Sequence, residues 1–301
     1  MTSRPSSPRV SVVIATYNRS QLLVEAIDSV LNQTFHDFEI IVVDDGSTDD
    51  TAQRIASLTG PIRYFRLDHS GRPAVVRNHA ISAAEGDVIA FLDDDDLWYS
   101  DKLHRQMELL DEFEIVGFVY TDIRFIDPHG SISEPILLPR QKEANLVFDH
   151  LLSDCFIYPS TVAVRRHFLD TVGAFDERLA VVEDYDLWLR LAHAAQAGCV
   201  PEPLALIRRT PAGISQQHEA LCYHNATLAL ERALAAYPLS FDQRRRGRMT
   251  LSKFHTHLGL LLLQRGELPS ARRHFVQSLG LNPFQRRAWV ALVRPSAVRH
   301  T

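Results

Sequence analysis

Short apolar runs alternate with helix-like segments through the first two hundred residues of this 301-residue chain, and this alternation limits the fold more than any other feature. Between the runs, apolar residues recur every three or four positions, as they do in helices that cover a sheet. Four runs rich in Val, Ile and Leu have the pattern of buried strands: Val10–Ala15, Glu39–Val43, Ile62–Phe65 and Asp87–Leu92. The pattern predicts an α/β fold, with a mostly parallel sheet covered by helices.

The second half of the chain completes this domain and then changes character. Further strands and a helix are predicted over Ile115–Ile126, Thr161–Val164, residues 183–196 and Cys199–Ile207. After about residue 210 the pattern is helical throughout. We therefore expect a disordered tail over residues 1–9, an α/β domain over 10–209 and a helical region over 210–301.

The net charge of −5 hides a division along the chain. Residues 1–205 carry 17 Lys and Arg against 33 Asp and Glu, whereas residues 206–301 carry 15 against 4. Three widely spaced cysteines give neither a disulfide framework nor a zinc site, which fits a reducing compartment. The apolar run Leu258–Leu263 is far shorter than the ~20 residues of a membrane span. These features predict a cytoplasmic protein, soluble or peripheral to the membrane.

Four consecutive carboxylates, Asp93 to Asp96, directly follow the fourth predicted strand. Adjacent carboxylates raise one another's pKa unless a cation compensates them. Ligands of such sheets bind beyond the carboxyl ends of the strands, where the pair Asp44-Asp45 is also expected. Oxygen ligands suit Mg²⁺ or Mn²⁺, ions that commonly accompany phosphate-bearing substrates. The alternative is a solvated acidic loop without a metal.

Five segments together resemble family 2 glycosyltransferases of the GT-A fold. They occur in that family's order and spacing, and the resemblance covers about residues 9–205. It implies a nucleotide-sugar donor, UDP-linked in our interpretation, and an inverting, metal-dependent transfer. The segments are VSVVIATYNR from Val10, IIVVDDGSTD from Ile40, GDVIAFLDDDDLW from Gly86, GAFDERL from Gly173 and EDYDLWLR from Glu183.

The resemblance assigns donor-binding roles to residues at the strand ends. Ala15 and Thr16 end the first strand, where backbone groups can face a nucleoside. Asp44 or Asp45 can accept the N3–H of a uracil-like base, and Arg72 takes the position of a donor-binding basic residue. Helix capping is a second interpretation of the Asp-rich turn, because Ser47 with Asp50 three residues later forms a capping-box pattern.

The metal-binding Asp-X-Asp of the family maps onto Asp93-Asp94-Asp95. An extended loop would send alternate side chains the same way, so Asp93 and Asp95 would share a face. We expect Asp95 to bind the metal directly with the help of Asp93, and Asp94 to lie beside the ribose.

The resemblance also makes Asp184 the catalytic base. The residue opens a predicted helix, where the helix dipole favours a carboxylate, so capping is the plain alternative. The implied acceptor is a saccharide or a lipid-linked sugar, in cell-surface glycan or polysaccharide synthesis. Two other functions stay open: an inactive scaffold that binds sugar nucleotides, and a phosphohydrolase that acts through Asp44.

The helical region is rich in arginine and contains one repeat-like segment. From Leu258 to Pro283 small and large residues follow the spacing of a tetratricopeptide hairpin, which predicts a single helical hairpin of that type. The arginines predict a contact with an anionic membrane surface, where a lipid-linked acceptor would lie. The competing interpretation is that they dock on the acidic domain. Nucleic acid is not favoured, because no reader module accompanies the charge.

Overall fold

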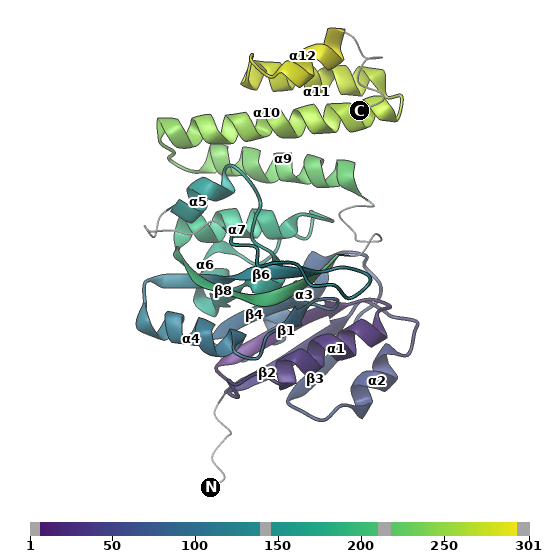
Figure 1. Cartoon of the computed structure of the whole chain (residues 1–301), viewed down its shortest axis with the longest axis vertical. Coiled ribbons are helices and arrows are strands. Elements are labelled where there is room, and N and C mark those ends of the chain that lie inside the picture. Colours follow the sequence, from purple (N-terminus) through teal and green to yellow (C-terminus); the bar gives the residue numbers. More distant parts are fainter. Residues whose placement is uncertain (1–6, 139–145, 210–217, 294–301) are drawn as a thin grey trace. The chain divides into compact units, whose positions relative to one another are not determined.

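The computed structural model describes residues 7–138, 146–209 and 218–293 (Figure 1). Its contacts divide the chain into two compact units. The sheet unit comprises residues 1–147, 156–180 and 190–211, and the helical unit comprises residues 148–155, 181–189 and 212–301. Residues 1–6 of the expected tail lie outside the described residues. Arg9 is described, and its guanidinium makes two hydrogen bonds to Asp111.

The sheet unit is built on an eight-stranded sheet with the order β3-β2-β1-β4-β7-β6-β8-β5. Its strands are β1 (Val10–Thr16), β2 (Phe38–Asp44), β3 (Ile62–Arg66), β4 (Val88–Asp93), β5 (Leu97–Trp98), β6 (Val116–Ile126), β7 (Ala163–Arg165) and β8 (Gln196–Arg208). Its helices are α1 (Ser20–Leu31), α2 (Thr51–Ser57), α3 (Pro73–Ala83), α4 (Lys102–Glu112), the short η1 (Pro159–Thr161) and α6 (Arg166–Val172). Residues of α5 (Leu146–Leu151) and α7 (Glu183–Ala194) belong to both units.

The first four strands form a continuous parallel part of the sheet. β1 pairs in parallel with β2 and β4, and β2 pairs in parallel with β3. β4–β7, β6–β7 and β5–β8 are antiparallel, whereas β6 and β8 are parallel. The Val and Ile residues of β1 and β2 are buried, which explains why these strands lack a polar face. The α/β fold class is confirmed, and the sheet is mixed.

The register of these strands brings their carboxyl ends to one level. Ala15 pairs with Val43 of β2 and Asp93 of β4, and Thr16 pairs with Asp44. Polar residues from three strands that are far apart in sequence therefore gather at one edge of the sheet.

The predicted capping box of Ser47 and Asp50 is wrong. Helix α2 begins at Thr51, and neither side chain caps it in that way. Ser47 Oγ instead accepts a hydrogen bond from the main-chain N–H of Asn18, at 2.9 Å. Asp49 accepts a hydrogen bond from the N–H of Ser20, the first residue of α1. The turn thus binds the start of α1 as well as its own helix.

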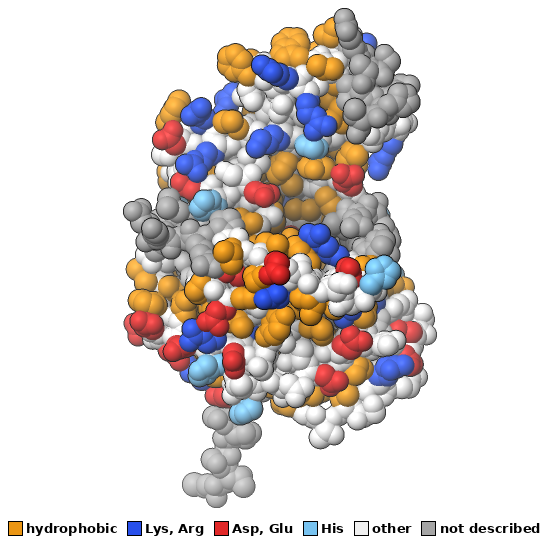
Figure 2. Space-filling view, viewed as in Figure 1, with side chains coloured by type: hydrophobic (Ala, Val, Ile, Leu, Met, Phe, Trp, Pro, Cys, Tyr) orange, Lys and Arg blue, Asp and Glu red, His pale blue; other side chains and the backbone are white. Residues whose placement is uncertain are grey.

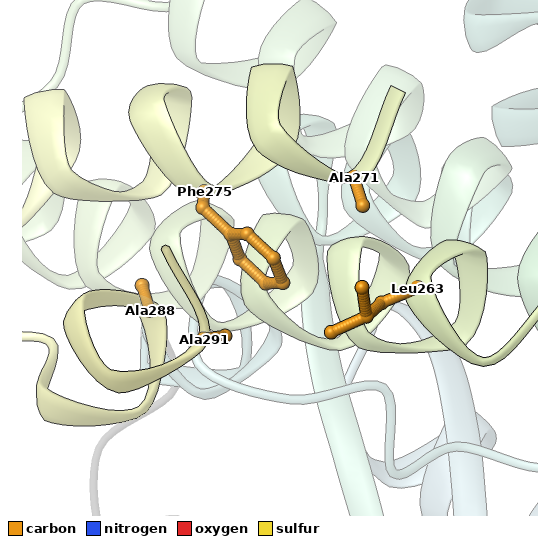
Figure 3. Packing of buried hydrophobic residues seen from close by; sticks show 5 residues of the cluster. All are labelled: Leu263, Ala271, Phe275, Ala288 and Ala291. Carbon is orange, nitrogen blue, oxygen red and sulfur yellow. The ribbon is translucent and has the colours of Figure 1, made fainter. Parts of the chain in front are cut away.

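The helical unit contains α9 (Glu219–Ala236), α10 (Phe241–Gln264), α11 (Leu268–Leu281) and α12 (Arg286–Val293). A capping box of Ser240 and Gln243 starts α10. Gly259 lets α10 approach α11 closely, because a Cβ there would lie 2.6 Å from the ring of Phe275. Figure 3 shows the core that α12 shares with this hairpin: Leu263, Ala271, Phe275, Ala288 and Ala291. The predicted helical region is confirmed, whereas its tetratricopeptide character stays a prediction.

Two further expectations from the sequence concern membrane-spanning helices and disulfides. Within the described stretches, no helix combines the length and apolar character needed to cross a bilayer. Cys155, Cys199 and Cys222 are not joined in disulfides. The cytoplasmic location stays a prediction.

Candidate active site

The four consecutive aspartates lie at the carboxyl end of β4 and form a tight turn. The N–H of Asp96 donates to the carbonyl of Asp93 at 3.1 Å, so the chain reverses instead of continuing extended. The expected extended loop is therefore wrong, whereas the shared face of Asp93 and Asp95 stays a prediction. Asp94 and Asp96 are buried, whereas the side chains of Asp93 and Asp95 are 30% and 18% exposed.

Arg19 compensates two neighbouring carboxylates of this turn. Its Nη1 lies 2.9 Å from Asp94 Oδ1 and 2.9 Å from Asp95 Oδ2. Asp94 Oδ2 also accepts a hydrogen bond from Thr16 Oγ1 at 2.8 Å, which ties the turn to the end of β1. Arg19 follows Asn18, which adopts a left-handed backbone (φ 52°) that few residues other than glycine tolerate.

The other two aspartates have partners from three further elements. Asp93 Oδ1 accepts a hydrogen bond from Arg77 of α3 at 2.6 Å. Asp96 accepts hydrogen bonds from Ser160 Oγ at 2.6 Å and from the main-chain N–H of Arg208 at 2.8 Å. Arg77 therefore ties its helix to the acidic turn.

The turn still holds more negative charge than its partners neutralise. Burial raises the pKa of Asp94 to about 6, although Arg19 acts in the opposite direction. Burial and the charge of Asp93 raise the pKa of Asp95. Burial and the charges of Asp93 and Asp95 raise the pKa of Asp96 well above its usual range. Part of each rise comes from repulsion between carboxylates, which a cation would relieve, so these residues are candidate ligands for a divalent metal.

The protein side chains alone do not complete a metal site. In the part of the chain that the structure describes, no group of three or more His, Cys, Asp or Glu side chains is arranged to hold an ion. An ion held by Asp93 and Asp95 would therefore need further oxygen ligands, as Mg²⁺ commonly obtains from substrate phosphates.

The predicted base-binding carboxylates both have structural partners. Asp44 is buried; its Oδ1 accepts a hydrogen bond from the N–H of Ser47 and its Oδ2 one from the hydroxyl of Tyr64. Asp45 accepts hydrogen bonds from the N–H groups of Ser70 and Gly71, and so holds the loop that precedes Arg72. A buried carboxylate with both oxygens engaged is a poor nucleophile, which weakens the case for a phosphohydrolase that acts through Asp44.

A cavity of about 400 Å³ lies beside these carboxylates. Its walls are Gly46, Arg66, Leu67, Asp68 and His69. Gly46 adopts a φ of 81°, and a Cβ there would meet the backbone N of His69 at 2.9 Å, so glycine is required in this turn. The imidazole of His69 stacks on the ring of Tyr17, with 4.1 Å between ring centroids.

Arg72 and Asn78 connect α3 to the segment around Glu177. Arg72 immediately precedes α3, is exposed, and its Nη1 donates to the carbonyl of Glu177 at 3.0 Å. Asn78 both donates to the carbonyl of Phe175 and accepts from its N–H, each at 2.9 Å. Arg190 fixes the start of the same segment by donating to the carbonyls of Val172, Gly173 and Ala174.

Asp184 is the second residue of α7, in the part of that helix that belongs to the helical unit. Its Oδ1 accepts a hydrogen bond from the N–H of Tyr185. Val182, two residues earlier, has a φ of 63°, a strained value for a β-branched residue. The buried Asn225 of α9 donates to the carbonyl of Val181 at 2.9 Å, so α9 fixes the backbone that leads to Asp184.

The structure therefore gathers most of the predicted residues. Ala15, Thr16, Asp44 and Asp93 meet at one edge of the sheet, and Asp94 and Asp95 lie in the turn that follows β4. Arg19, Ser160 and Arg208 also belong to the site but were not predicted from the sequence. Arg19 carried a usable signal, because it ends the first family-like segment, whereas nothing local in the sequence marks Ser160 or Arg208 as partners of the acidic turn.

Comparison with known proteins decides the family. The family described as Glycosyl transferase family 2 matches residues 11–173, more than half of the chain. The chain belongs to glycosyl transferase family 2.

Named relatives of this family member come from bacteria. An "uncharacterized glycosyltransferase" of Rickettsia felis is 36% identical over 203 residues, which cover 66% of this chain and 33% of the relative. The amylovoran biosynthesis glycosyltransferase AmsB of Erwinia amylovora is 33% identical, with coverages of 60% and 62%. A β-1,3-glucosyltransferase of Escherichia coli, named for UDP-Glc and α-D-GlcNAc-diphosphoundecaprenol, is 31% identical, with coverages of 60% and 69%. The chain spans about a third of the length of the Rickettsia felis relative.

A solved structure supports the fold over nearly the whole chain. The crystal structure of Staphylococcus aureus TarS residues 1–349, in complex with UDP-GlcNAc, has a TM-score of 0.73 and 21% identity. The match covers 94% of this chain and 83% of that one. At this identity the likeness concerns the fold alone.

Proposed function

We propose that this protein transfers a sugar from a UDP-linked donor to an acceptor hydroxyl, with inversion at the anomeric carbon, in the synthesis of a polysaccharide or cell-surface glycan. The observation that carries the proposal is the acidic turn of β4, which lies at the carboxyl ends of the parallel strands and retains excess negative charge. Such an edge is where α/β sheets bind ligands. The Escherichia coli relative, which is named for UDP-Glc, supports the choice of a uridine nucleotide.

Each part of the edge has a task in donor binding. Ala15 and Thr16 face the nucleoside, Asp44 and Asp45 shape the base pocket, and Asp94 lies next to the ribose. Arg72 binds the donor from the loop before α3. These roles follow the family assignment, and the hydrogen bond between Thr16 and Asp94 supports them by joining two elements of the pocket.

Asp95, assisted by Asp93, would hold Mn²⁺ or Mg²⁺. When bound, such an ion offsets the charge that develops on the departing nucleoside diphosphate. Burial and, after it, the charge of Asp93 raise the pKa of Asp95; a cation would relieve the repulsion between the two carboxylates, which supports this role.

Asp184 takes the proton of the acceptor hydroxyl as that oxygen attacks the donor sugar. The strained Val182 and the hydrogen bond from Asn225 support this role, because both fix the backbone next to the carboxylate. The acceptor is a saccharide or lipid-linked sugar, and the basic helices keep the enzyme at the cytoplasmic face of the membrane.

Calorimetry with UDP, GDP and their sugars, with and without Mn²⁺, tests donor binding. UDP-sugar affinity that depends on the metal is expected, and binding of no nucleotide would refute the proposal.

The Asp184→Asn variant tests the base. Loss of a positioned base typically slows turnover ~10²–10⁴-fold. We expect UDP release from a UDP-sugar, measured with a panel of saccharide acceptors, to fall by that factor while UDP affinity stays unchanged. Asp186→Asn is the matched control, because Asp186 lies two residues along α7 and faces Arg232 of α9 at 4.0 Å. Equal turnover in the wild type and Asp184→Asn would disprove the assignment.

A further inference from the structure

Helix α12 has two apolar sides, and only one of them belongs to the core of the helical unit. Ala288 and Ala291 point inward, toward Phe275 (Figure 3). Trp289 and Val293, four residues apart, lie on the other side and are 49% and 70% exposed. A second apolar side on a helix that is already packed is characteristic of a contact surface.

Arginines and a further aromatic ring border this outer side. Arg286 precedes Trp289 by three residues and Val293 by seven, so all three lie on one stripe of the helix. Phe284, just before α12, is 89% exposed. The indole N–H of Trp289 donates to the carbonyl of Pro283 at 2.8 Å, which fixes the ring. We define the α12 face by its six exposed residues: Phe284, Arg286, Arg287, Trp289, Val290 and Val293.

Helices α10 to α12 carry mostly positive charge. Residues 241–293 contain ten Lys and Arg and two acidic residues, Asp242 and Glu267. Within the described residues, neither Arg286 nor Arg287 has an acidic side chain at ion-pair distance, and both are exposed. In Figure 2, Lys and Arg side chains (blue) lie among hydrophobic ones (orange) over the C-terminal helices. The partner of this surface is therefore anionic and also accepts apolar side chains.

We propose that the α12 face binds the surface of an anionic lipid bilayer. Trp289, Phe284 and Val293 enter the headgroup region, while Arg286 and Arg287 contact lipid phosphates. A bilayer surface offers both chemistries at once, and aromatic and aliphatic side chains mixed with arginine are typical of helices that lie in that interface. The proposal deepens the proposed function and rests on its lipid-linked acceptor, but binding to vesicles requires neither donor nor turnover.

Sedimentation of the full chain with vesicles tests the charge requirement. We expect binding to phosphatidylcholine vesicles that contain phosphatidylglycerol and far weaker binding to phosphatidylcholine alone. An arginine near an anionic surface changes affinity about fivefold, so Arg286→Glu/Arg287→Glu should weaken binding at least about 25-fold. Arg54→Glu/Arg105→Glu is the control, with the same charge change on exposed side chains of the sheet unit. Equal loss in both double variants, or binding that ignores phosphatidylglycerol, would overturn the proposal.

Tryptophan fluorescence tests insertion directly. Trp98 and Trp188 are buried, so a blue shift on vesicle addition reports Trp289, and Trp289→Phe should lose the shift while retaining most of the binding. A shift that appears without vesicles as protein concentration rises would assign the α12 face to a second copy of the chain. A shift induced by double-stranded DNA but not by vesicles would assign it to nucleic acid. Either result would overturn the lipid assignment.

Discussion

Arg19→Met should destabilise the sheet unit and make it more responsive to metal. Arg19 is the guanidinium that two adjacent carboxylates share, at 2.9 Å each. Removal of one partner from a buried ion pair costs ~3–5 kcal/mol. The Arg19 side chain is 32% exposed, so solvent screens part of the interaction and we expect a loss of ~2–3 kcal/mol. The buried Asp94 would bear most of this cost.

In Arg19→Met, a divalent ion should recover much of that loss. In the wild type the ion has to compete with Arg19 for the oxygens of Asp95, whereas in the variant these oxygens are no longer occupied by the guanidinium. A ligand at 100 times its dissociation constant adds about 2.7 kcal/mol when it binds only the folded state. Without the guanidinium, Mn²⁺ should bind the acidic turn more tightly. The variant should therefore gain more stability from Mn²⁺ than the wild type does.

Native-state hydrogen exchange resolved by peptide is the suitable assay, because it reads the opening free energy of β4 separately from the helical unit. Arg54→Met is the matched control: Arg54 forms an exposed pair with Asp50, and its loss should change stability by no more than ~0.5 kcal/mol. Competition between Arg19 and the metal is refuted if Arg19→Met is as stable as the wild type, or if Mn²⁺ stabilises the variant and the wild type equally.

Two further predictions concern the helical unit. Gly259→Ala should lower the unfolding free energy of the helical unit by ~1 kcal/mol, because overpacking against Phe275 costs ~1–3 kcal/mol and outweighs the gain in helix propensity. Gly280→Ala, where a Cβ would meet no other atom within 4 Å, should stabilise the unit slightly. Urea unfolding compares the two variants, and equal effects would contradict the close packing at Gly259. His255, which contacts His274 at 3.1 Å, has a pKa lowered to about 4 by burial and by His274. As the pH falls, the imidazole of His255 is therefore protonated in the unfolded chain before it is protonated in the folded one. Stability should fall by up to ~3 kcal/mol from pH 6.5 to 4. In urea unfolding at a series of pH values, His255→Gln should show a weaker dependence of stability on pH.

The elements that could be predicted from the sequence are those with local signals. β1, β2 and β4 begin and end within a residue or two of the predicted runs, because β-branched apolar residues stop where polar turns start. The position of the acidic turn beyond β4 follows from the same signal. The parallel pairing of these strands then follows from the helices between them.

The partners within the site could not be predicted in this way. Asp96 meets Arg208 across 112 residues of sequence, and no periodicity encodes such a contact. The orientation of Asp96 depends on one turn hydrogen bond and on Ser160, which η1 supplies. The capping pattern at Ser47 failed for a similar reason: the backbone of Asn18, from another loop, takes the hydroxyl that a helix start would have used.

The burial of the acidic turn counts against one of its two sequence interpretations, the solvated acidic loop. A solvated acidic loop would leave its carboxylates in water, where their pKa values stay ordinary. Here Asp94 and Asp96 are buried, and the pKa of Asp94 rises to about 6 despite the nearby Arg19. The protein thus keeps repelling charges together at a cost in stability. Natural proteins commonly retain such unfavourable electrostatic energies at functional sites. A cation bound at the turn would reduce the repulsion between these carboxylates.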